Sequence, residues 1–496
     1  MGTGGLVLAV VASVLGLALA QPGIGFWPLV FVCLVPLLLA LRGRSLAARL
    51  AIAWVFGTLV SGAVAGWPAI EALAAYFELG WLPAALASAA VGQVFGALPI
   101  TLFALLAGDL RQGKPVLVPV RVGVAWMASE LVRGALLDGL PWMALAYSLV
   151  PVPELLGAAS LGGAAFVSGW LAAVNASLAL GLRARMRGAL LGGAAWTLLV
   201  GLGIGLSVPE GGAVRTERVD TPGWLRVRLV QGNVTNAERR DPGRARDSVR
   251  QLAQESAGSR ADLVVWPENA VSALMPANES LLRSSVPTPL PWTDFLLLGT
   301  LRAGTDPGVF YNTSLLLDRE LRPVGHADKR KLFPFSEFTP WPFSRSGSPG
   351  FEVTPGQTPP VLAVAGQRLG MLVCYEILFA ALARELVHEG AGLFVNLSND
   401  SWFGANRGLD QHLAAAVLRA VEFQRPVLRA TSTGITAAID AQGRVVAKLP
   451  VLEEGALSVS VLPGQGLSLY ARMGDAPGWI ASLLVLVLAL RPGRPG

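Results

Sequence analysis

Long apolar runs fill the first 207 residues, and they constrain the fold more than any other feature. Most of them reach the roughly 20 residues that a helix needs to cross a bilayer. Hydrophobic residues make up 53% of the 496-residue chain and charged residues only 15%, against roughly 25% in soluble domains. The sequence therefore predicts a multi-pass α-helical membrane bundle of about eight helices. The expected spans are 4–20, 24–41, 50–67, 82–108, 116–134, 161–182, 188–207 and a shorter run at 478–490.

Positive charge gathers in alternate connections between these runs. Together they hold eleven Arg and Lys and one acid, Asp109. The basic connections are 42–49, 109–121, 183–187 and 491–494. Because loops rich in Lys and Arg stay in the cytoplasm, both termini are expected there and the block 208–477 outside. The net charge of +6 then reflects topology, and no nucleic-acid partner is expected.

The first run ends in Ala18-Leu19-Ala20, which is typical of a signal-peptidase site. It lacks the positively charged start of a signal peptide, so a retained helix is expected.

The central block alternates short strands with helices, which predicts an α/β domain. The expected domains are a membrane bundle (1–207), a linker (208–224), a catalytic domain (225–465) and a last membrane helix with a cytoplasmic tail (466–496). Reactive groups in such folds gather at the carboxyl ends of strands. Three segments fit this position, and they contain Glu268, Cys374 and Asn399-Asp400.

Cys374 is the candidate nucleophile, since Cys33 lies in an apolar run and offers no disulfide partner. A thiol at a strand-to-helix turn lies near backbone N–H groups that bind an oxyanion. A buried structural Cys is the plainer alternative. The base could be His388 or His412, but nothing local marks either. Glu268, after an apolar strand, could also serve, although a solvated loop acid is the common reading.

Lysine is rare in this chain, which has Arg almost everywhere. Two of the four lysines, Lys329 and Lys331, stand almost side by side. A compact ammonium suits a developing oxyanion better than a guanidinium does. Chance placement on a solvated face is the alternative.

Three motifs occur in a fixed order: VVWPENA around Glu268, DKRKLFPFSEFTP around Lys329 and GMLVCYEILF around Cys374. With this order, the chain resembles the nitrilase superfamily. Combined with the apolar runs, it resembles the membrane-embedded apolipoprotein N-acyltransferase family over essentially its whole length. The resemblance implies an αββα sandwich for the catalytic domain. Residues of the membrane part that fit the family pattern include Trp126, Glu130, Arg133, Gly139, Pro141 and Trp142.

The resemblance also implies roles for individual residues. Cys374 would be the nucleophile, Glu268 the base and Lys329 the oxyanion stabiliser. Glu337 would position the lysine, and the N–H of Tyr375 would complete the oxyanion hole. Further supporting residues would be Glu376, Asn312 and Asn399. The family often has a Trp shortly after the Gln231-Gly232 segment, but the stretch here, through Arg240, has none.

The implied reaction moves an acyl chain from a phospholipid to Cys374 as a thioester. The chain then passes to the N-terminal α-amino group of diacylglyceryl-cysteine in an apolipoprotein, at the bacterial cytoplasmic (inner) membrane. No cofactor or metal is expected. A membrane-anchored amidase that hydrolyses a small amide is the alternative enzyme, and a transporter or receptor with a degenerate domain is the non-enzymatic one.

An aromatic, proline-broken stretch follows the lysine motif. Its rings could be core, or Phe338, Trp341 and Phe343 could form a lid that dips into the outer leaflet, because aromatic rings favour the membrane interface. Trp402 is grouped with them as a lipid contact.

Overall fold

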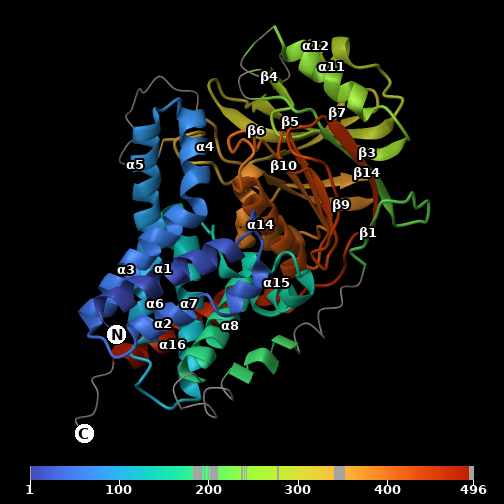
Figure 1. Ribbon diagram of the computed structural model, residues 1–496. Helices are drawn as coiled ribbons and strands as arrows, with labels where there is room; N and C mark the ends of the chain where they lie inside the picture. The colour runs from blue at the N-terminus through green and yellow to red at the C-terminus, as the bar shows by residue number, and fades with distance from the viewer. Residues whose placement is uncertain are drawn as a thin grey trace. The chain divides into compact units, whose positions relative to one another are not determined.

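The computed structural model divides the chain into two compact units (Figure 1). The helical unit consists of Met1–Val208, Asn406–Glu422 and Leu467–Gly496, and the sandwich unit of Pro209–Ala405 and Phe423–Gly466. The domain boundaries expected from the sequence stay a prediction. The residues described are 2–181, 193–194, 196–198, 200–201, 211–235, 238, 241, 243–275, 279–339 and 352–490.

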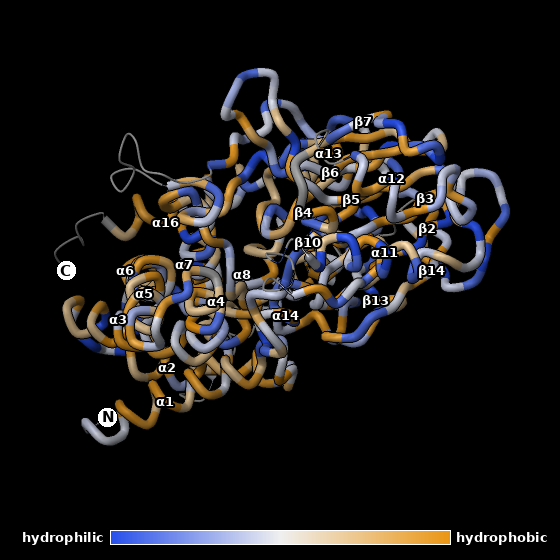
Figure 2. Tube along the Cα trace, turned by 90° about the horizontal axis from the view of Figure 1, so that it is seen from above, coloured by the Kyte–Doolittle hydropathy of each residue, from blue (hydrophilic) through white to orange (hydrophobic). Residues whose placement is uncertain are grey.

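The helical unit contains, among the described residues, four helices long and apolar enough to cross a membrane. Its helices are strongly hydrophobic along much of their length (Figure 2). The four are Thr3–Ala20, Leu46–Ala75, Trp81–Ala107 and Ala159–Gly181, with shorter apolar helices at Trp27–Leu41 and Ala476–Ala489. The expected run 188–207 lies largely outside the described residues, so the count of eight stays a prediction.

Many helical elements of this unit lie in the expected apolar runs, whereas several short ones and the helix Gly408–Phe423 lie outside them. In chain order, the helical elements are α1 (Thr3–Ala20), η1 (Trp27–Phe31), α2 (Val35–Leu41), α3 (Leu46–Ser61), η2 (Gly62–Gly66), α4 (Trp67–Phe77), α5 (Trp81–Gly92), η3 (Gln93–Ala97), α6 (Leu98–Ala107), α7 (Leu117–Ala135), η4 (Leu136–Asp138), η5 (Leu145–Leu149), η6 (Pro153–Leu156), α8 (Ala159–Gly181), α14 (Gly408–Phe423), α15 (Leu469–Met473) and α16 (Ala476–Leu490).

The two longest apolar helices each contain a π-helical segment, η2 and η3. They approach each other at small residues, as is common between membrane helices. A Cβ added to Gly57 would lie 2.6 Å from the Cα of Ala97, and one added to Gly96 would overlap the side chain of Ser61. Larger residues at either glycine would therefore push the two helices apart.

The sandwich unit is built on two mixed sheets that share one core. The order in the eight-stranded sheet is β1-β14-β2-β3-β5-β6-β7, with β4 paired to β5, and in the six-stranded sheet β13-β12-β11-β10-β9-β8. The strands are β1 (Val214–Arg215), β2 (Leu225–Gln231), β3 (Ala261–Val265), β4 (Val271–Met275), β5 (Thr293–Ala303), β6 (Phe310–Asp318), β7 (Pro323–Asp328), β8 (Val361–Val364), β9 (Gln367–Val373), β10 (Leu393–Ser398), β11 (Val427–Thr431), β12 (Ala437–Ile439), β13 (Val445–Lys448) and β14 (Gly455–Val461).

Apolar side chains of the two sheets pack together in one cluster, which includes Leu229 and Leu297 from one sheet and Met371 and Val395 from the other. A second cluster joins the larger sheet to α11 (Ala245–Ser256) and α12 (Glu279–Ser285). These two helices lie side by side (Figure 1). Helix α13 (Ala380–His388) contacts β9 of the other sheet. This is the nitrilase-type sandwich of sheets and helices that the resemblance implies.

Strand register brings the three chemical motifs to strand ends. Strands β2, β3 and β5 run parallel, and antiparallel β6 places Asn312 opposite Leu301, near the carboxyl end of β5. Strand β7 then pairs its last residue, Asp328, with Thr313. In the other sheet, β9 and β10 are parallel and end in register, with Val373 opposite Leu397. Asn312 and Lys329 therefore lie near the same end of the strands in the larger sheet.

Gly299 of β5 leaves room for the turn that carries Glu268. A Cβ there would lie 2.5 Å from the Cα of Glu268 and 2.7 Å from the carbonyl oxygen of Pro267. Gly299→Ala should therefore lower the thermal unfolding midpoint of the purified protein, since overpacking costs about 1–3 kcal/mol. Gly455→Ala is the control, because the nearest atoms around its Cβ lie at 3.7 Å. Equal midpoints for the two variants would contradict the proposed close approach.

Candidate active site

Glu268 lies just beyond β3, and both of its carboxylate oxygens are held. The residue is 4% exposed. Its Oε1 accepts a hydrogen bond from Nδ2 of Asn312 at 2.9 Å, and its Oε2 accepts one from the backbone N–H of Asn399 at 2.9 Å. These two bonds fix the orientation of the carboxylate, as a general base requires.

Lys329 follows β7 directly, and its ammonium lies between two glutamates. Its Nζ is 2.9 Å from Oε2 and 3.0 Å from Oε1 of Glu337, and 3.5 Å from Oε1 of Glu268. Asn312 uses its second amide hydrogen to reach Oε1 of Glu337 at 2.8 Å. A single asparagine therefore links both carboxylates that flank the lysine.

The charge on Lys329 is secured by these neighbours. Burial favours the neutral amine, but the attraction of Glu337 and Glu268 outweighs it and holds the pKa of Lys329 well above its usual value. The residue is only 2% exposed. A buried ammonium with a fixed position can stabilise a negative charge that develops beside it.

Cys374 stands at the turn between β9 and the helical turn η7 (Cys374–Leu378). Its φ of 54° lies in the left-handed region, which residues other than glycine rarely adopt. Such strain is held in place by surrounding structure and gathers at functional sites. Backbone N–H groups at the start of a helical turn have no partner within the turn, so this turn can supply oxyanion donors.

The thiol of Cys374 is held in its protonated form. Burial raises its pKa, the charge of Glu268 raises it further, and Lys329 lowers it in part. The site is therefore built for removal of the proton by a base during reaction, rather than for a resting thiolate. The nearby charges come from Glu268, Lys329 and Asp400, whereas His388 ends α13 and His412 lies in α14.

Glu376 connects the nucleophile turn to the lysine segment. Its Oε2 accepts a hydrogen bond from the N–H of Val373 at 2.7 Å, and its Oε1 accepts from the N–H groups of Arg330 and Lys331 at 2.8 and 2.9 Å. The neighbouring Tyr375 donates its hydroxyl to the carbonyl of Leu332 at 2.5 Å. Both contacts hold the chain after Lys329 against the turn of Cys374.

A buried polar network contacts the backbone of Cys374. Two of its members, Arg429 and Asn396, are absent from the sequence-based set of site residues, whereas Asp400 belongs to the expected segment of Asn399. Arg429 forms an ion pair with Asp400 at 2.5 Å, with both side chains 0% exposed, and also donates to Oδ1 of Asn396. Nδ2 of Asn396 donates to the carbonyl of Cys374 at 3.1 Å. The sequence does contain a sign of this network, because Asn396 and Arg429 are polar residues within otherwise apolar strands.

The expected lid can be described only in part. Trp341, Phe343 and the stretch near Arg240 lie partly or wholly outside the described residues, and the lid stays a prediction. Phe338 and Trp402 are half-buried. Nearer the lysine, Phe333 and Phe335 are 39% and 52% exposed.

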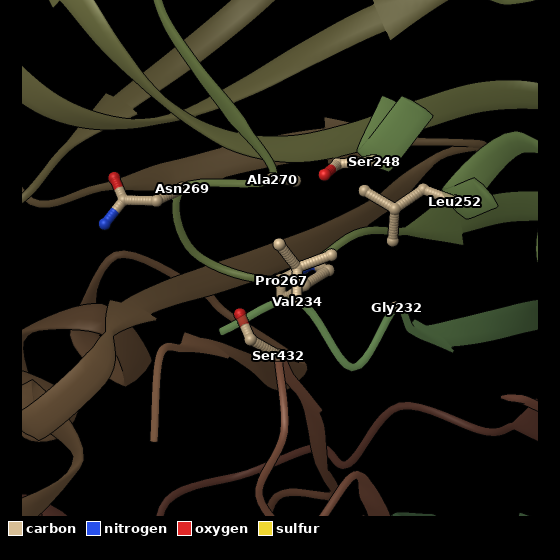
Figure 3. Close-up of a pocket in the computed structure, with 8 residues that line it drawn as sticks. All are labelled: Gly232, Val234, Ser248, Leu252, Pro267, Asn269, Ala270 and Ser432. Atoms are coloured by element: carbon tan, nitrogen blue, oxygen red, sulfur yellow. The ribbon is translucent and has the colours of Figure 1, made fainter. Parts of the chain in front are cut away.

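A small cleft lies beside the turn that carries Glu268 (Figure 3). Its lining is mostly apolar or small, with polar groups from two serines and one asparagine. The lining residues are Gly232, Val234, Ser248, Leu252, Pro267, Asn269, Ala270 and Ser432. Since Glu268, Lys329 and Cys374 do not line it, this cleft flanks the candidate catalytic side chains without containing them.

Within the described part of the chain, no cluster of three or more His, Cys, Asp or Glu is arranged to hold a metal ion.

Substitution of the two neighbouring lysines should have unequal effects. Lys329→Arg should lower activity by about 10²-fold or more, since a forked guanidinium cannot take the place of the ammonium between Glu268 and Glu337. Lys331 lies over the ring of Phe379 at 5.2 Å, a contact that Arg also makes, so Lys331→Arg should stay within about fivefold of wild type. Initial rates of the catalysed reaction measure both effects, and the reverse order would assign the role to Lys331.

Alkylation should report the protonated thiol. In a Cys33→Ser background, the rate at which iodoacetamide labels Cys374 should keep rising beyond pH 9, because only the thiolate reacts and the pKa of Cys374 is raised. A plateau below pH 9 would contradict this protonation state.

Two family profiles match separate parts of the chain. The carbon-nitrogen hydrolase family profile matches residues 226–465, and that of the apolipoprotein N-acyltransferase N-terminal domain matches residues 13–177. The apolipoprotein N-acyltransferase of Azotobacter vinelandii is 33% identical over 98% of this chain and 94% of its own. That of Geobacter metallireducens is 29% identical over 98% of this chain and 95% of its own.

A crystal structure of an amidase from Nesterenkonia sp. is also similar, at 18% identity and a TM-score of 0.35, and covers 53% of this chain and 98% of that one. The full-length relatives and the two family profiles agree with each other: the chain belongs to the apolipoprotein N-acyltransferase family.

Proposed function

We propose that this protein transfers an acyl chain from a phospholipid, through a thioester on Cys374, to the N-terminal α-amino group of diacylglyceryl-cysteine in apolipoproteins. The observation that carries the proposal is the position of Lys329, whose Nζ lies 2.9 Å from Glu337 and 3.5 Å from Glu268. Membership of the family supports the substrate classes.

In the first half-reaction, Glu268 accepts the proton of the thiol while the sulfur of Cys374 attacks the acyl carbonyl of the lipid. The negative charge on the carbonyl oxygen is stabilised by Lys329 and by the N–H of Tyr375. The tetrahedral adduct collapses, the C–O bond breaks, and Glu268 returns its proton to the departing alkoxide. A lysophospholipid leaves, and the acyl chain remains on sulfur.

In the second half-reaction, the α-amine of the acceptor attacks the thioester. Glu268 accepts a proton from the attacking nitrogen, and the C–S bond breaks as the amide forms. The sulfur leaves as a thiol once Glu268 has returned the proton. Glu337 keeps Lys329 in place through both steps, and Asn312 and Glu376 hold the surrounding backbone and carboxylates.

The proposal puts the sandwich unit on the extracytoplasmic side of the bacterial inner membrane, with both termini in the cytoplasm. The gathering of Arg and Lys in alternate connections supports this orientation. Both substrates are lipids, which accounts for a catalytic unit that is carried on apolar helices.

Incubation of the purified protein with an acyl-labelled phospholipid tests the proposal. Label should appear on Cys374 as a hydroxylamine-sensitive thioester and should move to an added diacylglyceryl peptide with a free amine. Cys374→Ser should remove all transfer, because a serine hydroxyl is far harder to deprotonate. Release of free fatty acid at the same rate with and without acceptor would instead indicate a hydrolase.

Glu268→Gln should block thioester formation, whereas His388→Gln and His412→Gln should leave the chemistry largely intact. Loss of acylation in the His variants, together with an active Glu268 variant, would overturn the choice of base.

A further inference from the structure

Two basic connections of the helical unit lie against each other. The loop 42–45 joins α2 to α3, and the loop 108–116 joins α6 to α7. Helix α6 contacts both α3 and α7, so the two loops adjoin the same group of helices. Together with the beginnings of α3 and α7, the loops carry six cations and a single acid, which are Arg42, Arg44, Arg49, Arg111, Lys114, Arg121 and Asp109.

Asp109 joins the two loops, and its carboxylate is occupied in doing so. Its Oδ1 accepts from the N–H of Gly43 at 3.1 Å and from the N–H of Arg111 at 3.0 Å. Its Oδ2 accepts from Nε of Arg111 at 3.0 Å. Gly43 also packs on the guanidinium of Arg111, since an added Cβ would lie 2.9 Å from its Cζ. The one acid of the cluster is therefore used by Arg111 and by the backbone of the loops.

Arg49 and Arg121 have N–H groups in protected positions that bond to no other described residue. Nη2 of Arg121 donates to the backbone carbonyl of Asp109 at 2.9 Å, but its buried Nε has no partner within the described part of the chain. The same holds for Nε and Nη1 of Arg49, in the first turn of α3. Because an unmade bond of a desolvated charged group is costly, both guanidiniums favour an additional acceptor.

The electrostatic setting of these two arginines favours an anion as that acceptor. Arg49 and Arg121 lie within range of mutual repulsion, and neither forms an ion pair with a carboxylate among the residues described. Helices α3 and α7 both begin here, and helix N-termini carry a partial positive charge. An anion between the two guanidiniums would relieve the repulsion, and the oxygens of a phosphate match the forked donors of arginine.

Apolar side chains beside the cluster indicate which kind of phosphate fits. Leu46 begins α3, Val116 and Leu117 begin α7, and all three are exposed. A free phosphate would gain nothing from these side chains, whereas the acyl chains of a lipid would cover them. Basic pockets between membrane helices bind anionic lipid head groups. Topology alone accounts for positive loops, but it requires neither their convergence nor buried N–H groups without an acceptor.

We propose that Arg49 and Arg121 form a binding site for the phosphate of an anionic phospholipid. The site contains none of the residues of the candidate active site. Both guanidiniums donate to the phosphate diester, and the acyl chains lie against Leu46 and Leu117. The orientation given under the proposed function puts this lipid in the cytoplasmic leaflet, and the site rests on the proposed function for the leaflet alone.

A double variant and a charge-matched control test the site. Arg49→Gln/Arg121→Gln removes both guanidiniums while keeping part of each aliphatic stem. The control, Arg322→Gln/Lys448→Gln, removes the same charge from two exposed positions of the sandwich unit. Both are made in a Cys374→Ser background, so that acyl transfer consumes no lipid.

Binding is measured on the full-length protein in micelles with excess phosphatidylcholine, to which fluorescent phosphatidylglycerol is added. The excess keeps the occupancy of any general phospholipid site constant. The apparent Kd for phosphatidylglycerol should rise by about tenfold or more in the double Gln variant and change by less than about twofold in the control. Fluorescent phosphatidylcholine should bind more weakly to the parent protein, because its ammonium would face the other cations of the loops.

An unchanged Kd in the double Gln variant would overturn the site, as would an equal loss of affinity in the control. Equal affinity of the parent protein for the two fluorescent lipids would overturn the preference for an anionic lipid. Displacement by inorganic phosphate as effective as displacement by unlabelled phosphatidylglycerol would replace the lipid with a free anion.

Thermal unfolding without phosphatidylglycerol shows whether the double Gln variant is folded. If it is not, Arg49→Lys/Arg121→Lys takes its place, since this variant keeps both charges but loses the forked donors. Its Kd should rise by about threefold, and no rise would overturn the site. The assay measures binding only, so a failure of acyl transfer would count against the proposed function and leave this result unaffected.

Discussion

The buried ammonium of Lys329 is the group on which the rest of the site depends. An uncompensated charge at this depth would cost several kcal/mol, so the chain surrounds it with Glu337 at 2.9 Å and Glu268 at 3.5 Å. Two carboxylates beside one ammonium leave a negative balance, which explains why burial and Glu268 together keep the thiol of Cys374 protonated. The same arrangement makes Glu268 both a partner of the lysine and the candidate base for the thiol.

Asn312 contacts both acids and the lysine segment. Its side-chain amide nitrogen donates to Glu268 at 2.9 Å and to Glu337 at 2.8 Å, and its backbone carbonyl accepts from the N–H of Lys329 at 2.8 Å. A residue on β6 therefore sets the spacing of the two acids and the start of the lysine segment at once. Loss of either acid would leave a buried donor without an acceptor.

Sequence reasoning was most effective where chemistry follows directly from a strand. Glu268 and Asn399 were expected just after strands, and they follow β3 and β10. Cys374 was expected after a strand and follows β9. The roles of Lys329 and Glu337 came from the family resemblance, because nothing in composition or periodicity shows which glutamate reaches the lysine.

Other features depend on contacts between residues far apart in sequence, which a single sequence does not reveal. The sequence shows that Arg429 and Asn396 interrupt apolar strands. It does not show that Arg429 pairs with Asp400 and, through Asn396, supports the backbone at Cys374. The π-helical segments were equally hidden, since the apolar run 50–67 predicts an ordinary helix and gives no sign of η2 within it.

Helix α14 lies in the connection between two parallel strands. Strands β10 and β11 pair with Phe394 opposite Val427, so the connection between them is a crossover. The helix of that crossover carries Gln411, Arg419 and Glu422, all buried. Their partners include Val64, Trp142 and the N–H of Ala164, which all belong to the helical unit.

A crossover helix with these buried polar groups would be poorly satisfied in a sandwich unit that folded alone. The polar residues of α14 therefore find their partners within the helical unit. These partners explain why polar residues persist in α14, where an isolated α/β domain would be expected to have apolar ones.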